Sequence, residues 1–197
     1  MLSVGDQVPR GGNAFTRWLG KWGLRRLGFR LEGELPNEPR FIILGIPHTS
    51  NWDFIIVMLV MMALNLQINW IAKESMFRFP FKRLLLKLGG VPINRAAAGG
   101  VVDATVKALK EAEKLIIVIA PEGTRSPAPE WKSGFHRIAR GAGVPFVLGN
   151  LDYEKKILTL GPTMHPGDDA AADIRWIRSQ YTNARPKHPE RWHPGDF

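Results

Sequence analysis

The stretch FIILGIPHTSNWDFIIVMLVMMAL, residues 41–64, decides the fold. It opens with a continuous apolar run over residues 41–46, which is typical of a strand buried on both faces of a sheet. A second apolar run over residues 51–64 is long enough for a helix, and the polar residues between the two runs predict a turn. A strand, a turn and an apolar helix in succession indicate an α/β unit.

The same alternation continues toward the C-terminus. Strands are predicted over residues 69–72, 91–94, 115–120, 144–151 and 156–160, and helices over 79–88, 101–114 and 170–181. The run LIIVIA at 115–120 is apolar throughout, as in the centre of a parallel sheet. The expected fold class is therefore α/β, with a mainly parallel central sheet flanked by helices.

On the N-terminal side lies a basic amphipathic segment. Residues 13–31 place Phe15, Trp18, Leu19 and Trp22 at helical spacing among arginines and lysines. Such an N-terminal amphipathic helix can lie in the headgroup region of a membrane, where indole rings and cations each find their preferred depth. The same pattern also suits a terminal helix packed on the domain, because amphipathicity alone serves both uses.

Composition narrows the function classes. The 197 residues carry 27 Lys and Arg against 18 Asp and Glu, and the net charge of +9 favours an anionic partner, either nucleic acid or an acidic membrane surface. The absence of cysteine excludes a disulfide framework, a thiolate zinc site and a cysteine nucleophile. The longest apolar run, residues 54–66, is shorter than the roughly 20 residues that cross a bilayer, and the first dozen residues contain no signal-peptide pattern.

The segment PHTSNWD, residues 47–53, carries the first candidate for chemistry, because α/β sheets place ligands at the carboxyl ends of their strands. His48 can act as a general base near neutral pH, and Asp53 can fix its tautomer if the turn between them brings the two side chains together. A structural interpretation is also open. In it Ser50 is a helix N-cap, Asp53 is the acid of a capping box and His48 simply ends the strand.

Three further segments adjoin predicted strands. PEGTR at 121–125 combines a glycine that lets the backbone approach a ligand with an arginine suited to phosphate, although it also fits a polar loop with a Glu122–Arg125 surface pair. GVPINR at 90–95 ends in Arg95, which together with Arg125 makes a candidate phosphate pocket. GVPFV at 143–147 opens a strand with proline and is compatible with a structural role.

Taken together, the four segments resemble the lysophospholipid acyltransferase family, which includes the 1-acylglycerol-3-phosphate acyltransferases. His48 and Asp53 match its signature of a histidine, four residues and an aspartate, and PEGTR matches its third block almost letter for letter. Residues 90–95 match its second block, and Val144-Pro145 opens its fourth. The resemblance spans residues 41–150, with Pro47 where the family often has asparagine.

The resemblance implies a glycerolipid acyltransferase-like fold and the transfer of a fatty acyl group from acyl-CoA or acyl carrier protein to a lysophospholipid hydroxyl. His48 and Asp53 are then the catalytic pair, and backbone N–H groups near Gly123 are candidate donors to the developing oxyanion. Glu122 is expected to bind a glycerol hydroxyl or to fix an arginine. No metal and no cofactor other than the thioester donor is implied. The implied substrate-binding residues are Arg95, Glu122, Gly123, Thr124 and Arg125.

The amphipathic pattern, the resemblance and the prolines near the C-terminus together predict a membrane-surface segment (1–39), an acyltransferase domain (40–183) and a Pro-rich C-terminal arm (184–197). The expected partners are a lysolipid acceptor, an acyl thioester donor and an anionic membrane surface, with no nucleic acid. The expected location is the cytoplasm, at the inner face of the membrane.

Two other functions stay open at this point. The charge and the tryptophans interleaved with basic residues favour a nucleic-acid-binding module, and the fold also suits a catalytically silent lipid-binding protein. Met58, Met61 and Met62 fit core packing, and they also suit the lining of an acyl channel, since methionine adapts to flexible chains.

Overall fold

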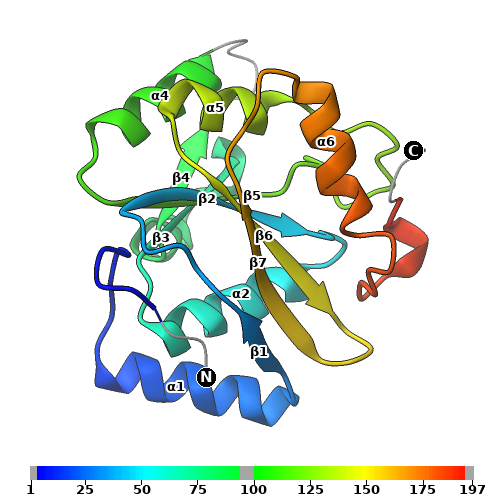
Figure 1. Ribbon diagram of the computed structural model, residues 1–197. Coiled ribbons are helices and arrows are strands. Elements are labelled where there is room, and N and C mark those ends of the chain that lie inside the picture. The colour runs from blue at the N-terminus through cyan, green and yellow to red at the C-terminus, as the bar shows by residue number, and fades with distance from the viewer. Residues whose placement is uncertain (1–3, 94–99, 194–197) are drawn as a thin grey trace.

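In the computed structural model, which describes residues 4–93 and 100–193, seven strands form one sheet in the order β1-β7-β6-β2-β5-β3-β4 (Figure 1). Neighbouring strands pair in parallel except β6 and β7, which are antiparallel. The predicted mainly parallel sheet is confirmed. The strands are β1 (Arg30–Gly33), β2 (Arg40–Ile46), β3 (Ile68–Lys73), β4 (Gly90–Ile93), β5 (Leu115–Ile119), β6 (Phe146–Asp152) and β7 (Ile157–Met164).

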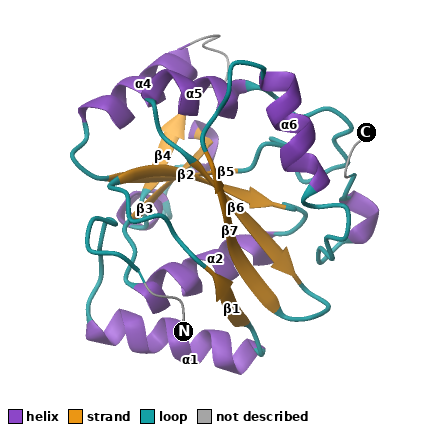
Figure 2. Cartoon of the chain, in the orientation of Figure 1, coloured by secondary structure: helices purple, strands orange, loops and turns teal. Residues whose placement is uncertain are grey.

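Helices cover both faces of this sheet (Figures 1 and 2). α1 (Ala14–Leu27) and α2 (Asn51–Leu64) lie on one face. α4 (Gly100–Glu111), α5 (Gly134–Ala142) and α6 (Ala170–Ser179) lie on the other. The turn η1 (Glu74–Met76) and the short helix α3 (Lys82–Lys87) connect β3 to β4, and η2 (Pro189–Arg191) lies near the C-terminus. The result is a three-layer α/β/α arrangement.

The position of β2 in the sheet explains why its sequence is apolar throughout. Phe41 and Ile43 point into the core under α1 and α2, whereas Ile42, Leu44 and Ile46 point into the core under α4, α5 and α6. Alternate side chains leave a strand on opposite faces, and here both faces are covered. β2 therefore holds the centre of the sheet, with β5 and β6 on its two sides.

The helix α1 packs on α2 through glycine. Gly20, Gly23 and Leu24 are its buried residues, and a Cβ atom added to Gly20 would lie 2.6 Å from the carbonyl oxygen of Leu59. The absence of side chains at these positions lets the two helix backbones approach closely. The predicted N-terminal amphipathic helix is confirmed as a helix that packs on the domain.

The face of α1 that points away from α2 carries an aromatic stripe. Phe15, Trp18 and Trp22 are 65%, 57% and 53% exposed, and consecutive rings stack at centroid distances of 5.9 and 6.3 Å. The sequence left two uses open for this helix, packing on the domain and lying in the headgroup region of a membrane. The structure shows the packing, and the stripe that stays exposed does not conflict with the membrane use.

Two elements were not expected from the sequence. β1, within the region assigned to the N-terminal segment, pairs in parallel with β7, and its sequence RLEG holds one apolar side chain and is mostly exposed. α5 carries glycine among its nine residues, yet Phe135, Ile138, Ala139 and Ala142 repeat at the spacing of a buried helix face. β7 also extends to Met164, beyond the predicted residues 156–160.

Candidate active site

The candidate site lies at the carboxyl ends of β2 and β5, which are neighbours in the sheet. His48 follows β2 and Glu122 follows β5, and the two residues meet although they are 74 positions apart in the sequence. Parallel strands end at the same edge of a sheet, so the loops that follow them are brought together there.

Asp53 is a buried residue in the first turn of α2 and contacts His48. Its Oδ2 atom lies 3.2 Å from Nδ1 of His48 and accepts hydrogen bonds from the N–H groups of Thr49 and Ser50, both at 2.8 Å. Ser50 is the N-cap of α2, and its Oγ accepts the N–H of Trp52. The capping box and the His48–Asp53 contact therefore coexist, because one carboxylate oxygen serves both.

The other oxygen of Asp53 binds a residue that the sequence reasoning missed. Tyr153, in the turn between β6 and β7, donates its hydroxyl to Oδ1 of Asp53 at 2.6 Å. Burial opposes the ionisation of Asp53, but the hydrogen bonds from His48, Tyr153 and Ser50 outweigh it and hold the pKa of Asp53 below its usual value. Burial, together with this hydrogen bond, raises the pKa of Tyr153.

Glu122 lies beside the His48 backbone. Its Oε1 accepts the N–H of His48 at 2.9 Å, and Oε2 is buried with no hydrogen-bond partner among the described residues. Burial raises the pKa of Glu122 to about 7. The family resemblance implies that Glu122 binds a glycerol hydroxyl or fixes an arginine; in the structure its Oε1 is directed at the His48 main chain, and the implied role stays a prediction.

Arg125 approaches His48 from the opposite side of the ring. Its Nε donates to Nε2 of His48 at 3.1 Å, so the two ring nitrogens contact Asp53 and Arg125 respectively. In the same loop, Gly123 has φ 65° and its N–H donates to the carbonyl oxygen of Ala120 at 3.1 Å. Thr124 is exposed, with Oγ1 accepting the N–H of Ser126. Arg95, the other predicted phosphate ligand, lies outside the described residues.

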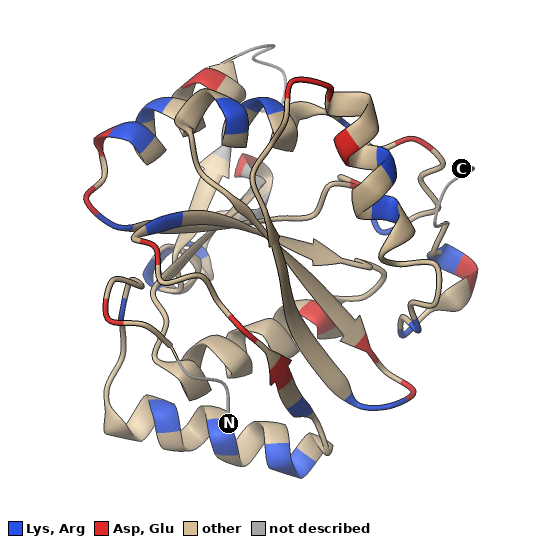
Figure 3. Cartoon of the chain, viewed as in Figure 1, with Lys and Arg blue, Asp and Glu red and all other residues tan. Residues whose placement is uncertain are grey.

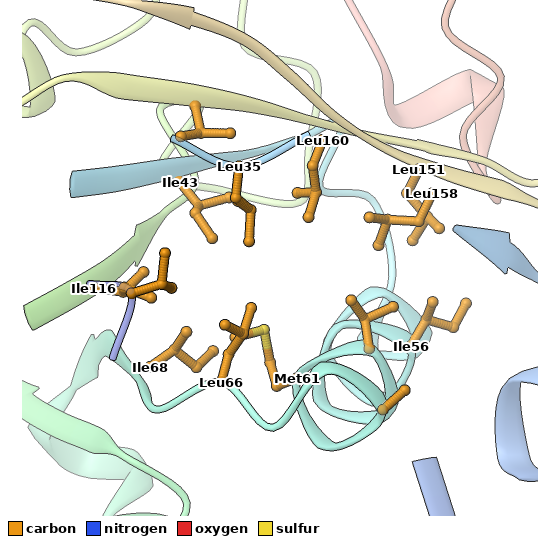
Figure 4. Packing of buried hydrophobic residues seen from close by; sticks show 14 of the residues in the cluster. Leu35, Ile43, Ile56, Met61, Leu66, Ile68, Ile116, Leu151, Leu158 and Leu160 are labelled. Carbon is orange, nitrogen blue, oxygen red and sulfur yellow. The ribbon is translucent and has the colours of Figure 1, made fainter. Parts of the chain in front are cut away.

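Two hollows meet at His48. A cavity of about 160 Å³ lies between α2 and the sheet and is lined almost entirely by apolar side chains, Met58 and Met61 among them. Figure 4 shows Ile43, Leu158 and Leu160 of the sheet facing Met61 of α2 across this space. A wider groove of about 840 Å³ lies along the strand ends, where Arg125, Thr124 and Lys132 contribute polar groups.

Further observations concern membrane spans and metal sites. No helix within residues 4–93 and 100–193 has both the length and the apolar content needed to span a bilayer. In the same part of the chain, no three side chains of His, Asp or Glu are grouped so as to hold a metal ion.

Comparison with known proteins identifies a family and a similar solved structure. Residues 27–147, more than half of the chain, match the acyltransferase family. The fold is similar to the crystal structure of the 1-acyl-sn-glycerophosphate (LPA) acyltransferase PlsC from Thermotoga maritima, with a TM-score of 0.60 and 17% identity over 86% of this chain and 76% of that chain. No curated protein matches the sequence. At this identity the structural likeness establishes the fold.

Proposed function

Because the chain belongs to the acyltransferase family, we propose that it moves a fatty acyl group from acyl-CoA or acyl carrier protein to a hydroxyl of a lysophospholipid such as 1-acylglycerol-3-phosphate. The observation that carries this proposal is the contact of His48 with Asp53 at the junction of an apolar cavity and a wider groove that also holds Thr124, Arg125 and Lys132. A base at such a junction can reach a lipid hydroxyl in the groove while an acyl chain lies in the cavity.

In the proposed reaction His48 is the general base. Its Nε2 accepts the proton of the acceptor hydroxyl as the hydroxyl oxygen attacks the thioester carbonyl carbon. The tetrahedral intermediate then expels the thiolate, which takes the proton from the imidazolium, and the new ester leaves. Asp53 holds the ring by Nδ1 and stabilises its positive charge during the transfer. This sequence needs no acyl-enzyme and no metal.

We assign the acceptor phosphate to Arg125. In the structure its guanidinium donates to Nε2 of His48, the atom that the acceptor hydroxyl must reach. A phosphate offers Arg125 a charged, bidentate partner, which is stronger than a neutral imidazole nitrogen. Binding of the acceptor phosphate therefore also frees the base. Arg95 shares this role in the proposal, as the family resemblance implies.

The apolar cavity is the proposed site of a fatty acyl chain. It begins at His48 and Asp53 and continues between α2 and the sheet past Met58 and Met61. Methionine side chains adapt their shape to flexible apolar ligands. Met61 is also part of the buried core under α2, so packing and chain binding are compatible at this position.

Membrane docking is proposed for residues 1–39, with residues 40–183 as the transferase and 184–197 as a C-terminal arm. Basic residues lie along α1 (Figure 3), the helix that also carries the aromatic stripe. Near α3, Phe79 is 96% exposed and Phe81 is also exposed, with Lys82 and Arg83 following them. Each cation near an anionic leaflet contributes about 1 kcal/mol.

Vesicle binding tests this docking. Replacing Trp18 and Trp22 with serine is expected to weaken binding to vesicles of phosphatidylcholine and phosphatidylglycerol, because both indoles lose their contact with the headgroup region. Trp176→Ser, at an exposed tryptophan of α6, is the matched control. Equal binding by all three proteins would reject the stripe as the docking surface, and tight binding to oligonucleotides through α1 would favour a nucleic-acid module.

The reaction itself is tested by thioester consumption. Purified protein is given long-chain acyl-CoA or acyl carrier protein, with and without a panel of lysolipids, beside a His48→Ala variant, and products are identified by mass. The proposal expects a diacyl lipid whose formation requires the acceptor and His48. Thioester cleavage without an acceptor would instead indicate a thioesterase. If no combination of thioester donor and lysolipid gives any reaction, the protein is a lipid-binding protein without catalytic activity.

A further inference from the structure

The carboxylate of Asp53 receives hydrogen bonds from two separate parts of the chain. Oδ2 takes the N–H groups of Thr49 and Ser50 together with Nδ1 of His48, all of them local to the loop before α2. Oδ1 takes the Tyr153 hydroxyl, which comes from a position 100 residues away. This tyrosine lies beyond residues 27–147, the part of the chain that matches the family.

The surroundings of Tyr153 hold its ring in place. Its backbone N–H donates to the carbonyl oxygen of Arg185 at 2.8 Å, and the ring of Phe29 meets it edge-on at a centroid distance of 5.6 Å. Two ammonium groups face the ring, Lys156 from the β6–β7 turn and Lys187 from the C-terminal segment, each with Nζ 5.8 Å from the centroid. A phenol fixed on several sides can hold the carboxylate that it binds.

We propose that Tyr153 is a positioning residue of the acyl transfer, which keeps Oδ2 of Asp53 on Nδ1 of His48 by binding Oδ1. The inference rests on the proposed function. Without this donor Oδ1 is a partly buried carboxylate oxygen with no partner among the described residues, and the carboxylate can rotate about its Cβ–Cγ bond to satisfy it. Rotation would draw Oδ2 away from the imidazole.

The position of the Asp53 carboxylate also affects the charged form of His48. A carboxylate oxygen held on Nδ1 stabilises the imidazolium, and a carboxylate that turns away leaves the charged ring without this contact. The other ionisable groups that face this assembly are Arg125 at Nε2 of His48, Glu122 beside the His48 backbone, and the ammonium groups of Lys156 and Lys187. None of these four groups is changed when the tyrosine hydroxyl alone is removed, so the effect of that hydroxyl can be isolated.

The test compares the two tyrosines of the chain. Tyr153→Phe removes the donor and keeps the ring against Phe29. Tyr181→Phe removes the hydroxyl of a buried tyrosine whose oxygen has no hydrogen-bond partner in the described residues, and it serves as the matched control. Circular dichroism and thermal unfolding verify that both variants are folded.

For Tyr153→Phe we expect kcat to fall by roughly tenfold to a hundredfold, the range for losing a hydrogen bond to a charged group, while KM stays near its wild-type value. The acid limb of the kcat/KM profile should move to lower pH, because the imidazolium loses its contact with Oδ2 of Asp53. Tyr181→Phe should change neither. A merely structural tyrosine would lower stability without moving the pH profile, and an unchanged kcat and acid limb in Tyr153→Phe would overturn the proposal.

A second measurement separates this inference from the proposed function. The imidazole resonances of His48, assigned with the His48→Ala variant, are titrated by NMR in the wild-type protein and in both tyrosine variants. The inference expects the His48 titration curve to move to lower pH in Tyr153→Phe only. If the wild-type protein transfers no acyl group, the proposed function fails, and this titration still decides whether Tyr153 acts on the pair. An unmoved curve would overturn the role of Tyr153 whatever the activity.

Discussion

Glu122 is a residue whose burial makes the stability of the protein depend on pH. Its pKa is about 7 in the folded chain against 4.5 for an ordinary glutamate, because burial disfavours the charged form. Between these two pH values the folded state binds more protons than the unfolded state, so stability falls as pH rises from 4.5 through 7. The difference is worth up to about 3 kcal/mol.

Glu122→Gln is therefore expected to flatten this part of the stability curve. Glutamine keeps an oxygen for the His48 N–H and has no proton to lose. Urea unfolding at pH 5 and at pH 8 measures the change in unfolding free energy for both proteins. Asp53, whose pKa is lowered, gains its stabilising charge below this window and does not mask the result. An equal loss of stability in the wild type and the variant between the two pH values would contradict the assignment.

Arg125 yields a prediction about acceptor choice. Arg125→Gln is expected to lower kcat/KM by about tenfold to a hundredfold for phosphate-bearing acceptors, since a charge-assisted contact is lost. A monoacylglycerol without phosphate should lose much less. Arg137→Gln, at an exposed arginine of α5, is the control for loss of charge. Equal losses for both acceptors would mean that Arg125 does not select the phosphate.

At the scale of single residues, the sequence predicts the roles of some side chains at the site and not of others. His48, Asp53 and Arg125 follow from short motifs at strand ends, and they meet in the structure. The part played by Tyr153 has no local signal, because it depends on how the β6–β7 turn reaches the first turn of α2. The direction of Glu122 toward the His48 N–H likewise depends on the pairing of β2 with β5.

The contact between α1 and α2 provides a prediction for an element. Gly20→Val should destabilise the protein by about 1–3 kcal/mol, the usual effect of overpacking, because its side chain would meet the backbone of Leu59 and Ala63. Arg17→Val, at an exposed position of the same helix, carries the β-branched penalty without the clash. Urea unfolding measures both variants. Similar unfolding free energies for the two would show that α1 does not need close approach at Gly20.

Helices and strands were predictable from the sequence where the segment is apolar along its whole length. The apolar runs of β2, α2 and β5 lie in the middle of the fold, and their continuous apolarity, their lengths and the turn residues that bound them were enough to predict them. β1 has four residues and one apolar side chain, so its strand state comes from pairing with β7 and not from local preference. The antiparallel β7 is also fixed by tertiary pairing, since a strand pattern does not state its direction.

At the scale of the whole molecule, the described part of the C-terminal arm, residues 184–193, contacts the segments that carry the candidate site. The His188 N–H donates to Oγ1 of Thr49, the Arg185 carbonyl accepts from Tyr153, and the Lys187 ammonium lies 4.7 Å from the ring centroid of Trp52. Ala184 is buried in the core on the far face of the sheet. The arm thus joins the loop before α2 to the β6–β7 turn.

Deleting residues 184–197 is expected to lower both Tm and kcat, because two backbone hydrogen bonds at the site are lost along with the burial of Ala184. With each bond worth about 1 kcal/mol, Tm should fall by about 5 °C. Replacing Arg185 and His188 with alanine keeps both backbone bonds and should have a much smaller effect. Differential scanning calorimetry and the thioester assay measure these changes. An unchanged Tm in the deletion would show that the arm does not support the site.

The pairing of β1 with β7 determines where the N-terminus of this protein can be truncated. A cut after residue 39 would remove α1 as intended, and β1 with it, leaving one side of β7 without its parallel neighbour. An uncovered strand at a sheet margin is a template for another copy of the same chain, and it invites aggregation. Copies of the shortened enzyme would then aggregate by pairing at the exposed edge of β7. The resulting loss of soluble protein would be mistaken for the loss of membrane binding through α1.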